Sequence, residues 1–393
     1  MPKPKRSEAP PNSDLLEWCE SEFKRYLHVT DPGFLYVTLG TVAANCYLGK
    51  PVWLMLVGPT GCGKTDALMA IAAARPDWFR VLSDASKASF LSGSAKRERS
   101  KDATGGLLKD IAAKDIRFLV FGEYGTILAQ SKDDYNQITS MQREIWDGQV
   151  HRPVGSDGGK MLDWTGKVGE LAACTNQIDK VLEQEVACGV RWLIWRYPAS
   201  SGWQEAMKSG ENNDPIEMRE CLANAAGAVI AGLQWDTKPR ELTEHERLRI
   251  TRLSSLSARL QGAIPRDSYH VEDVVNLPIE AYPTRLGPAL SRIYLGMEQI
   301  GLHKEECWRQ IKKIAIDTAP ALRVAVLREW AYRASNGGGQ FNAAEIAETI
   351  RCGTEVVERQ LEDMSYLGLM LRRSGTMGWS YEMPVATAEE MID

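Results

Sequence analysis

The chain has 393 residues, of which 44% are hydrophobic and 25% are charged, a composition typical of a globular protein with two or three domains. Its formal net charge of −5 argues against a protein that coats nucleic acid with its whole surface, and no apolar run approaches the ~18 residues that cross a bilayer. The first residues lack the apolar core of a secretion signal and the eight cysteines include no C-x-x-C pair, so we expect a cytoplasmic protein without membrane contact, zinc or disulfides.

The first elements in chain order are a tail and two helices. Residues 1–12 are rich in proline and charge, which predicts a disordered tail. Ser13 and Asp14 can cap a first helix because apolar residues follow them at helical spacing, and a second helix covers about residues 33–47. We expect both helices to pack on the core that follows.

An apolar run at residues 52–57 then leads into a G-x-x-x-x-G-K-T loop. Its residues are Gly58, Pro59, Thr60, Gly61, Cys62, Gly63, Lys64 and Thr65. The run predicts a buried strand, and the small residues let the backbone N–H groups of the loop point at phosphate oxygens. Lys64 would reach the β- and γ-phosphates, the Thr65 hydroxyl would bind Mg²⁺, and the following helix, with Asp66 in its first turn, would present its positive end to the anion. The stretch predicts a site for ATP and Mg²⁺.

A short strand at residues 79–82 and a polar stretch at residues 83–106 follow this loop. The polar stretch contains Lys96, Arg97 and Arg99. Two interpretations stay open, a solvated loop and a loop that faces nucleic acid.

A second buried strand, residues 116–121, ends at Gly122 and Glu123. In a P-loop ATPase the strand beside the phosphate loop ends in two carboxylates, of which one holds Mg²⁺ through water and the other polarises the attacking water. Glu123 takes the catalytic position, whereas Gly122 leaves the metal without one outer ligand, so we expect slow hydrolysis. The alternative is a core strand that ends at a surface glutamate.

Three further elements carry polar residues at strand ends or turns. After a helix at about 131–147, residues 149–164 predict a β-hairpin with Lys160 near its tip. The next buried strand ends in Thr175 and Asn176, and an amide there can hydrogen-bond both the γ-phosphate and the attacking water. After a helix at about 179–187, Arg191 opens another strand, from which it could reach the nucleotide of a neighbouring subunit.

Together these residues resemble an AAA+ ATPase, with residues 58–65 as Walker A, 118–123 as Walker B, 175–176 as sensor 1 and 189–192 as the arginine-finger segment. The hairpin between Walker B and sensor 1 resembles that of the MCM-like and superfamily-3-like helicases of phages and mobile elements. The chain departs from this family at Gly122, where the family has Asp, and in having no MCM-type N-terminal DNA-binding domain. No sensor 2 arginine can be chosen among Arg247, Arg249 and Arg285.

The resemblance implies an α/β fold: a P-loop core with a parallel sheet over residues 13–200 and a helical lid with connecting helices over 201–335. We expect the polar residues 199–240 to be an exposed connection to the lid helices. Residues 336–393 read as helix, Gly-containing turn, helix and hairpin, which predicts a winged helix whose second helix Thr354 would cap. That helix carries Glu355, Glu358, Glu362 and Asp363 against Arg359 alone, so we favour a protein contact or a structural role over base readout.

These features predict a ring, with a hexamer expected, that couples ATP hydrolysis to translocation on single-stranded or forked DNA. The hairpin residues Arg152, Lys160 and Lys167 and the basic loop residues would grip phosphates in its channel. One alternative is an ATP-gated scaffold in which slow hydrolysis holds an assembly that recruits a nuclease, transposase or replication partner. A protein remodeller is disfavoured, because only Phe90 and Trp164 offer the aromatic residue that a polypeptide-gripping loop needs.

Overall fold

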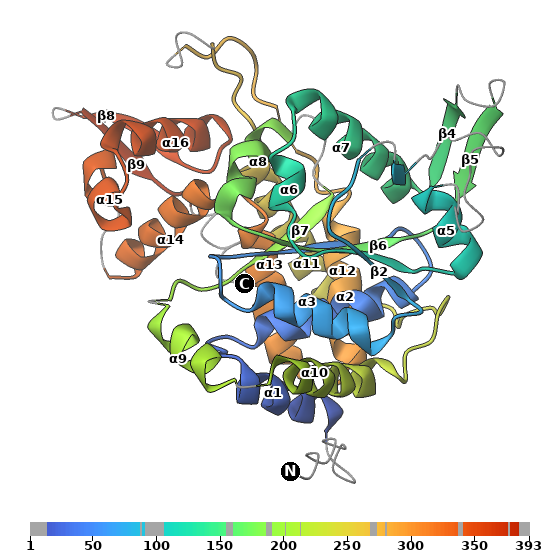
Figure 1. Cartoon of the computed structure of the whole chain (residues 1–393). Helices are drawn as coiled ribbons and strands as arrows, with labels where there is room; N and C mark the ends of the chain where they lie inside the picture. Colours follow the sequence, from blue (N-terminus) through green and yellow to red (C-terminus); the bar gives the residue numbers. More distant parts are fainter. Residues whose placement is uncertain are drawn as a thin grey trace. The chain divides into compact units, whose positions relative to one another are not determined.

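The computed structural model describes residues 14–86, 89–90, 106–154, 160–185, 191–200, 202–212, 214–267, 273–279, 281–336, 341–375 and 378–384 (Figure 1). The predicted tail at 1–12 and the basic residues Lys96, Arg97 and Arg99 lie outside them. The chain divides into two compact units. The first takes its residues from 1–178, 191–240 and 292–310, and the second from 179–190, 241–291 and 311–393. The region expected as lid and connecting helices, 201–335, is therefore shared between the two units.

A five-stranded parallel sheet forms the centre of the first unit, which confirms the expected mixed α/β class. Its strands are β1 (Trp53–Val57), β2 (Phe79–Leu82), β3 (Phe118–Phe121), β6 (Gly169–Cys174) and β7 (Trp192–Arg196), in the spatial order β2-β3-β6-β1-β7. Every residue of β1, β3 and β6 is buried, as expected for near-continuous apolar strands covered on both faces. From the sequence we expected the strand that ends before Gly122 to lie beside the phosphate-loop strand. In the structure β6 lies between these two strands, β3 and β1.

Helices cover both faces of this sheet. One face carries α2 (Gly33–Cys46) and α3 (Lys64–Ala74), with α1 (Leu15–Tyr26) and α10 (Pro215–Ile230) packed beyond them, and the other carries α6 (Gly125–Leu128) and α7 (Lys132–Asp147) (Figure 1). The first unit also holds α5 (Leu107–Lys114) and α9 (Trp203–Glu211). Helix α2 is mostly apolar, and all its residues are buried, including the polar Thr38, Thr41 and Asn45. Helix α10 buries seven residues, so the stretch 199–240 is not simply an exposed connection: its second half belongs to the core.

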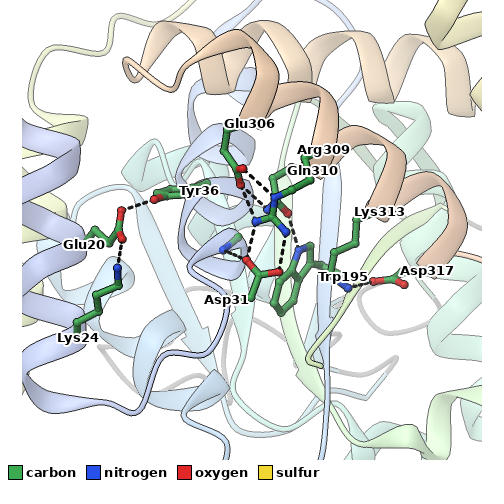
Figure 2. A network of polar contacts seen from close by, with 11 residues as sticks. Glu20, Lys24, Asp31, Tyr36, Trp195, Glu306, Arg309, Gln310, Lys313 and Asp317 are labelled. Carbon is green, nitrogen blue, oxygen red and sulfur yellow. Dashed lines mark hydrogen bonds and ion pairs between the residues drawn. The ribbon is translucent and has the colours of Figure 1, made fainter. Parts of the chain in front are cut away.

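Polar contacts join α1, α2 and β7 to the part of α13 (Lys304–Asp317) that belongs to the first unit (Figure 2). The guanidinium of Arg309 donates to both carboxylate oxygens of Asp31, at 2.8 and 3.1 Å, and the Gly33 N–H donates to the same carboxylate at 2.8 Å. Gln310 accepts a 2.8 Å hydrogen bond from the indole of Trp195 in β7, and Tyr36 donates to Glu20 of α1. The start of α2 is thus bonded to both α1 and α13, and α13 is bonded in turn to β7.

Glycine permits the crossing of α2 and α12 (Leu286–Gln299) within the first unit. A Cβ at Gly296 would stand 2.2 Å from the carbonyl oxygen of Gly40, and a Cβ at Gly40 would stand 2.5 Å from Cγ of Met297. Only glycine fits where the two backbones approach this closely.

The second unit contains α8 (Asp179–Glu185), α11 (Glu244–Gln261), α14 (Ala321–Ser335), α15 (Ala343–Ile350) and α16 (Thr354–Tyr366), followed by the antiparallel strands β8 (Leu371–Gly375) and β9 (Gly378–Glu382). Its core joins the end of α11 to α14, α15 and α16 through side chains such as Leu260, Leu327, Trp330, Ile346 and Leu361.

The second helix of this C-terminal part differs from its prediction in two ways. Gly353 is the N-cap of α16, so Thr354 is its first helical residue and not its cap. Glu362 and Asp363 do not form a free acidic surface, because Arg266 donates to both, at 2.9 and 2.6 Å. The Arg266 and Asp363 side chains are only 10% and 8% exposed, so this ion pair lies in the interior of the unit.

Candidate functional site

The phosphate-type loop begins where β1 ends. The Gly58 N–H donates to the carbonyl of Cys174 at 3.2 Å, and a Cβ at Gly58 would stand 2.9 Å from Cβ of Tyr197. Pro59, Thr60 and Gly61 are exposed on the outer turn, and Gly61 and Gly63 have φ of +84° and +80°, a region that favours glycine. Gly63 is the N-cap of α3, and no side chain of the described residues caps this helix. The first N–H groups of α3 therefore stay available to an anion.

Lys64 and Thr65 extend the loop toward the rest of the sheet. Lys64 is 4% exposed, and its ammonium donates to the carbonyl of Pro59 at 2.7 Å, so it lies folded across the loop. The Thr65 hydroxyl donates to the carbonyl of Gly122 at 3.0 Å, which joins the start of α3 to the end of β3 across the inserted β6. A Cβ at Gly122 would stand 3.2 Å from Cε of Met69 and 3.5 Å from Cγ2 of Thr65. A side chain at 122 would therefore start beside the methyl group of Thr65.

Glu123 and Asn176 follow the ends of the two neighbouring strands β3 and β6. The Glu123 side chain is exposed, and its carboxylate accepts a 3.0 Å hydrogen bond from the N–H of Gly125. Asn176 is exposed at the start of the 3₁₀ helix η2 (Asn176–Ile178). Burial raises the pKa of the Cys174 thiol, at the end of β6, to about 12; the charge of Glu123 adds to the rise and that of Lys64 opposes it. Cys174 thus lies within the electrostatic reach of both predicted catalytic groups.

A cavity of about 240 Å³ adjoins the other side of the loop. Its walls come from the end of α1, the loop and α3, and helices α9 and α10: Tyr26, Leu27, His28, Gly61, Cys62, Gly63, Asp66, Glu205, Lys208, Ser209, Asn212, Pro215, Met218 and Arg219. The Asn212 amide donates to the carbonyl of Tyr26 at 2.8 Å, which closes the wall between α9 and α1. Sequence reasoning found only the loop side of this cavity and Asp66, since no spacing pattern connects residues 26–28 with 205–219.

Arg191 immediately precedes β7. The parallel register pairs Trp192 with Trp53 at the start of β1, so Arg191 lies at the N-terminal ends of the strands, whereas the loop follows the C-terminal end of β1. Its side chain is 8% exposed, its Cζ lies 5.6 Å from the centre of the Trp146 ring, and Nη2 lies 4.0 Å from the carboxylate of Asp147. To act on the nucleotide of a neighbouring subunit, the guanidinium has to leave this contact with α7.

The predicted hairpin is formed by β4 (Gln149–Val154) and β5 (Lys160–Thr165), and Lys160 pairs with Val154 at the end of the ladder. Its turn, residues 155–159, lies outside the described residues, as do the side chains of Arg152 and Lys160. The register places positions 152 and 160 on the same face of the ladder as Val150 and Trp164, because alternate residues share a face. Val150 and Trp164 are buried at the base, so that face continues from the core of the unit.

Lys167, predicted to contact phosphate, is held by backbone carbonyls in this structure. Its ammonium donates to the carbonyls of Asn45 (2.7 Å) and Tyr47, at the C-terminal end of α2, where Arg292 also donates to Tyr47 at 2.8 Å. Burial lowers the pKa of Lys167 to about 7, and the nearby charge of Arg292 adds to the effect. Lys167 therefore closes a helix end.

The three arginines considered for sensor 2 belong to the second unit, Arg247 and Arg249 in α11 and Arg285 just before α12. In the first unit, Arg219 of α10 lines the cavity beside the loop. Sequence reasoning did not consider Arg219, since it comes before the stretch that resembles a lid helix.

Comparisons with known proteins add little to this geometry. No protein-family model and no curated protein sequence matches the chain. Among solved structures, the A-form apo structure of the NrS-1 C-terminal region is similar to 66% of this chain, with 10% identity and a TM-score of 0.33. The match spans 58% of that structure. None of the described helices combines the length and apolar character needed to cross a bilayer, and the described residues contain no cluster of three His, Cys, Asp or Glu side chains able to hold a metal ion.

Proposed function

We propose that the first unit binds and hydrolyses ATP with Mg²⁺ as an AAA+ ATPase. The observation that carries this proposal is that four predicted groups, the loop, Thr65, Glu123 and Asn176, come together at the C-terminal ends of the strands. The loop follows β1, Thr65 contacts the backbone at the end of β3, Glu123 comes directly after that contact, and Asn176 follows β6, which lies between the two strands. Residues from three separate parts of the sequence thus follow neighbouring strands at the same side of the sheet, which supports a γ-phosphate site there.

The chemistry assigned to each group follows from its atoms. Backbone N–H groups of the loop and the N-terminus of α3 hold phosphate oxygens, and Lys64 exchanges its bond with Pro59 for the β- and γ-phosphates. Glu123 leaves the N–H of Gly125 to accept a proton from the attacking water, which Asn176 orients. The Thr65 hydroxyl suits Mg²⁺, an oxygen-preferring cation that neutralises phosphate charge, but Gly122 supplies no carboxylate beside it.

The cavity beside the loop provides room for the nucleoside. It is lined by Gly61, Gly63 and Asp66, whereas Thr65, Gly122 and Glu123 do not line it. The nucleoside would then lie beside the loop and apart from the hydrolysis site, with the triphosphate between them. A volume of about 240 Å³ suits a single nucleoside.

For the coupled activity we propose a ring, with a hexamer expected, that moves on single-stranded or forked DNA. The position of Arg191 at the edge of the sheet away from its own loop supports action on a neighbouring copy, and the hairpin β4–β5 is a projecting element that can contact a strand (Figure 1). Helices α15 and α16 with β8 and β9 support a winged helix, whose inward-facing pair Arg266 and Asp363 favours a structural or protein-contact role.

The second candidate function is an ATP-gated scaffold. The observation that favours it is Gly122, because residue 122, whose carbonyl accepts from the Thr65 hydroxyl, supplies no carboxylate of its own. Slow hydrolysis would then keep an ATP-bound assembly together for a partner protein.

ATP turnover measured with and without single-stranded and forked DNA tests these functions. Lys64→Ala should abolish nucleotide binding and Glu123→Gln should retain binding without turnover, whereas the exposed-charge controls Lys109→Ala and Glu348→Gln should behave like the wild type. Stimulation by DNA supports the motor, and ATP-dependent assembly with negligible turnover supports the scaffold. Undiminished ATP binding by Lys64→Ala would contradict both.

A further inference from the structure

We propose that Gln142 of α7 is a positioning residue that joins the ends of β3 and β6 to the hairpin β4–β5, so that the hairpin responds to the state of the nucleotide. The inference rests on the proposed ATPase function. The Gln142 side chain is 3% exposed and lies between two partners. Its Oε1 accepts a 2.8 Å hydrogen bond from the hydroxyl of Tyr124, and its Nε2 donates a 2.8 Å hydrogen bond to Oε2 of Glu170.

One partner follows β3 and the other lies in β6, the two strands whose ends lead to the predicted catalytic groups. Tyr124 directly follows Glu123, and its N–H donates to the carbonyl of Ala173 in β6 at 2.7 Å. Glu170 is in β6, whose end leads to Asn176, and it pairs with Leu119 of β3 and Trp53 of β1. A displacement of Glu123 relative to Asn176 therefore changes the separation of the two groups that Gln142 bridges.

The bridge has little tolerance for a change of geometry. Glu170 is fully buried, its Oε1 has no hydrogen-bond partner among the described residues, and burial raises the pKa of the carboxyl well above its ordinary range. The amide of Gln142 is thus the partner on which this buried group depends. A buried polar network of this kind favours a small number of discrete arrangements, because an unpaired polar group in the interior is costly.

On the other side, α7 continues almost directly into the hairpin. The helix ends at Asp147, and Gly148 (φ +83°) alone separates it from β4 (Figure 1). The Gly166 N–H, just after β5, donates to the Gly148 carbonyl at 3.1 Å, and a Cβ at Gly148 would stand 2.9 Å from the Gly166 carbonyl oxygen. Gln142 lies only about 9 Å along the helix from this joint, given a rise of about 1.5 Å per residue.

The same helix also holds the predicted arginine finger. Arg191 packs on Trp146, one turn beyond Gln142, and the ring of Tyr124 meets the ring of Trp192 edge-on with 5.5 Å between their centres. Helix α7 is therefore in contact with the strand ends of its own site, with the side chain expected to reach a neighbouring site, and with the hairpin. A shift of this one rigid element would change all three together.

Hydrogen exchange of the full-length protein, alone and with ADP or the slowly hydrolysed analogue ATPγS, tests the coupling. In the wild type, exchange in residues 132–147 and in the hairpin should differ between the two nucleotides. Tyr124→Phe removes only the hydroxyl that donates the hydrogen bond to Gln142. This variant should abolish the difference in exchange while its affinity for nucleotide stays unchanged. Gln142→Met, which keeps the side-chain length, should do the same.

The matched control is Tyr47→Phe, which deletes another buried tyrosine hydroxyl of the first unit, bonded to the carbonyl of Leu295 at 3.1 Å. This variant should keep the nucleotide-dependent difference, which separates coupling from a loss of stability. Retention of the difference in both Tyr124→Phe and Gln142→Met overturns the inference. A wild-type protein that binds both nucleotides but shows the same hairpin exchange with each also overturns it. A wild type that binds no ATP overturns the proposed function, and the inference with it.

Discussion

Replacing Gly122 with Asp should add a carboxylate next to Thr65 at a small cost in stability. The new Cβ would stand 3.2 Å from Cε of Met69, so the methionine end has to move by a few tenths of an ångström. Overpacking costs ~1–3 kcal/mol, and loss of glycine flexibility in the unfolded chain offsets about 0.4–1 kcal/mol of this. Met69 is only partly buried and its thioether is flexible, so we expect a net loss near the lower end, about 1 kcal/mol.

The assay is ATP turnover as a function of Mg²⁺ concentration for the wild type, Gly122→Asp and Gly122→Ala. Groups that surround a metal's direct ligands change its affinity by about 10–100-fold, so the Mg²⁺ concentration for half-maximal turnover should fall about 10-fold in the Asp variant. The Ala variant contacts Met69 in the same way but adds no carboxylate, and it should match the wild type. Equal changes in both variants, or an unchanged Mg²⁺ requirement in Gly122→Asp, would refute the placement of residue 122 at the metal.

Three further predictions concern other parts of the chain. Arg191→Ala should retain ATP binding but lose hydrolysis, and mixing it with Lys64→Ala subunits should restore some turnover; no recovery would argue against action in trans. The folded-state pKa of Lys167 is about 7 against an ordinary 10.5, so the folded state binds fewer protons than the unfolded state between these pH values. The free energy of unfolding of the wild type, measured in urea relative to Lys167→Met, should therefore rise from pH 7 to pH 10. A difference that stays constant with pH would contradict this. Arg266→Met leaves the buried Asp363 without its closest cation and should lower the free energy of unfolding by about 3 kcal/mol, measured in thermal melts. A loss below about 1 kcal/mol would show that the pair contributes little to stability.

Several features could be predicted because their causes are local. The strand at β1 and the hairpin β4–β5 follow from apolar runs and turn residues close together in the sequence, and the structure confirms both. The N-cap at Asp14 is confirmed as well, with its carboxylate accepting from Leu16 and Glu17. The cap proposed at Thr354 was wrong because Gly353 precedes it, and a hydroxyl in the first helical position does not cap the helix.

Charged residues were harder to interpret, because their partners lie far away in the sequence. Lys167 reads as an exposed cation next to a hairpin, yet it binds carbonyls at Asn45 and Tyr47, more than a hundred residues earlier. Glu362 and Asp363 read as an acidic surface, whereas Arg266 donates to both from a segment that no local pattern connects to α16. Spacing along one helix shows which face a charge occupies, but not what packs against that face.

The sequence by itself determined the phosphate-type loop, the buried strands, and the polar residues that follow them, because these depend on residue type and short spacing. Only the tertiary structure decided the order β2-β3-β6-β1-β7, which brings Asn176 between the loop and Glu123. It also decided that Tyr124, Gln142 and Glu170 meet in the interior. The reason is physical: strand order and buried polar pairing are set by which apolar faces cover one another, and that depends on the whole folded chain.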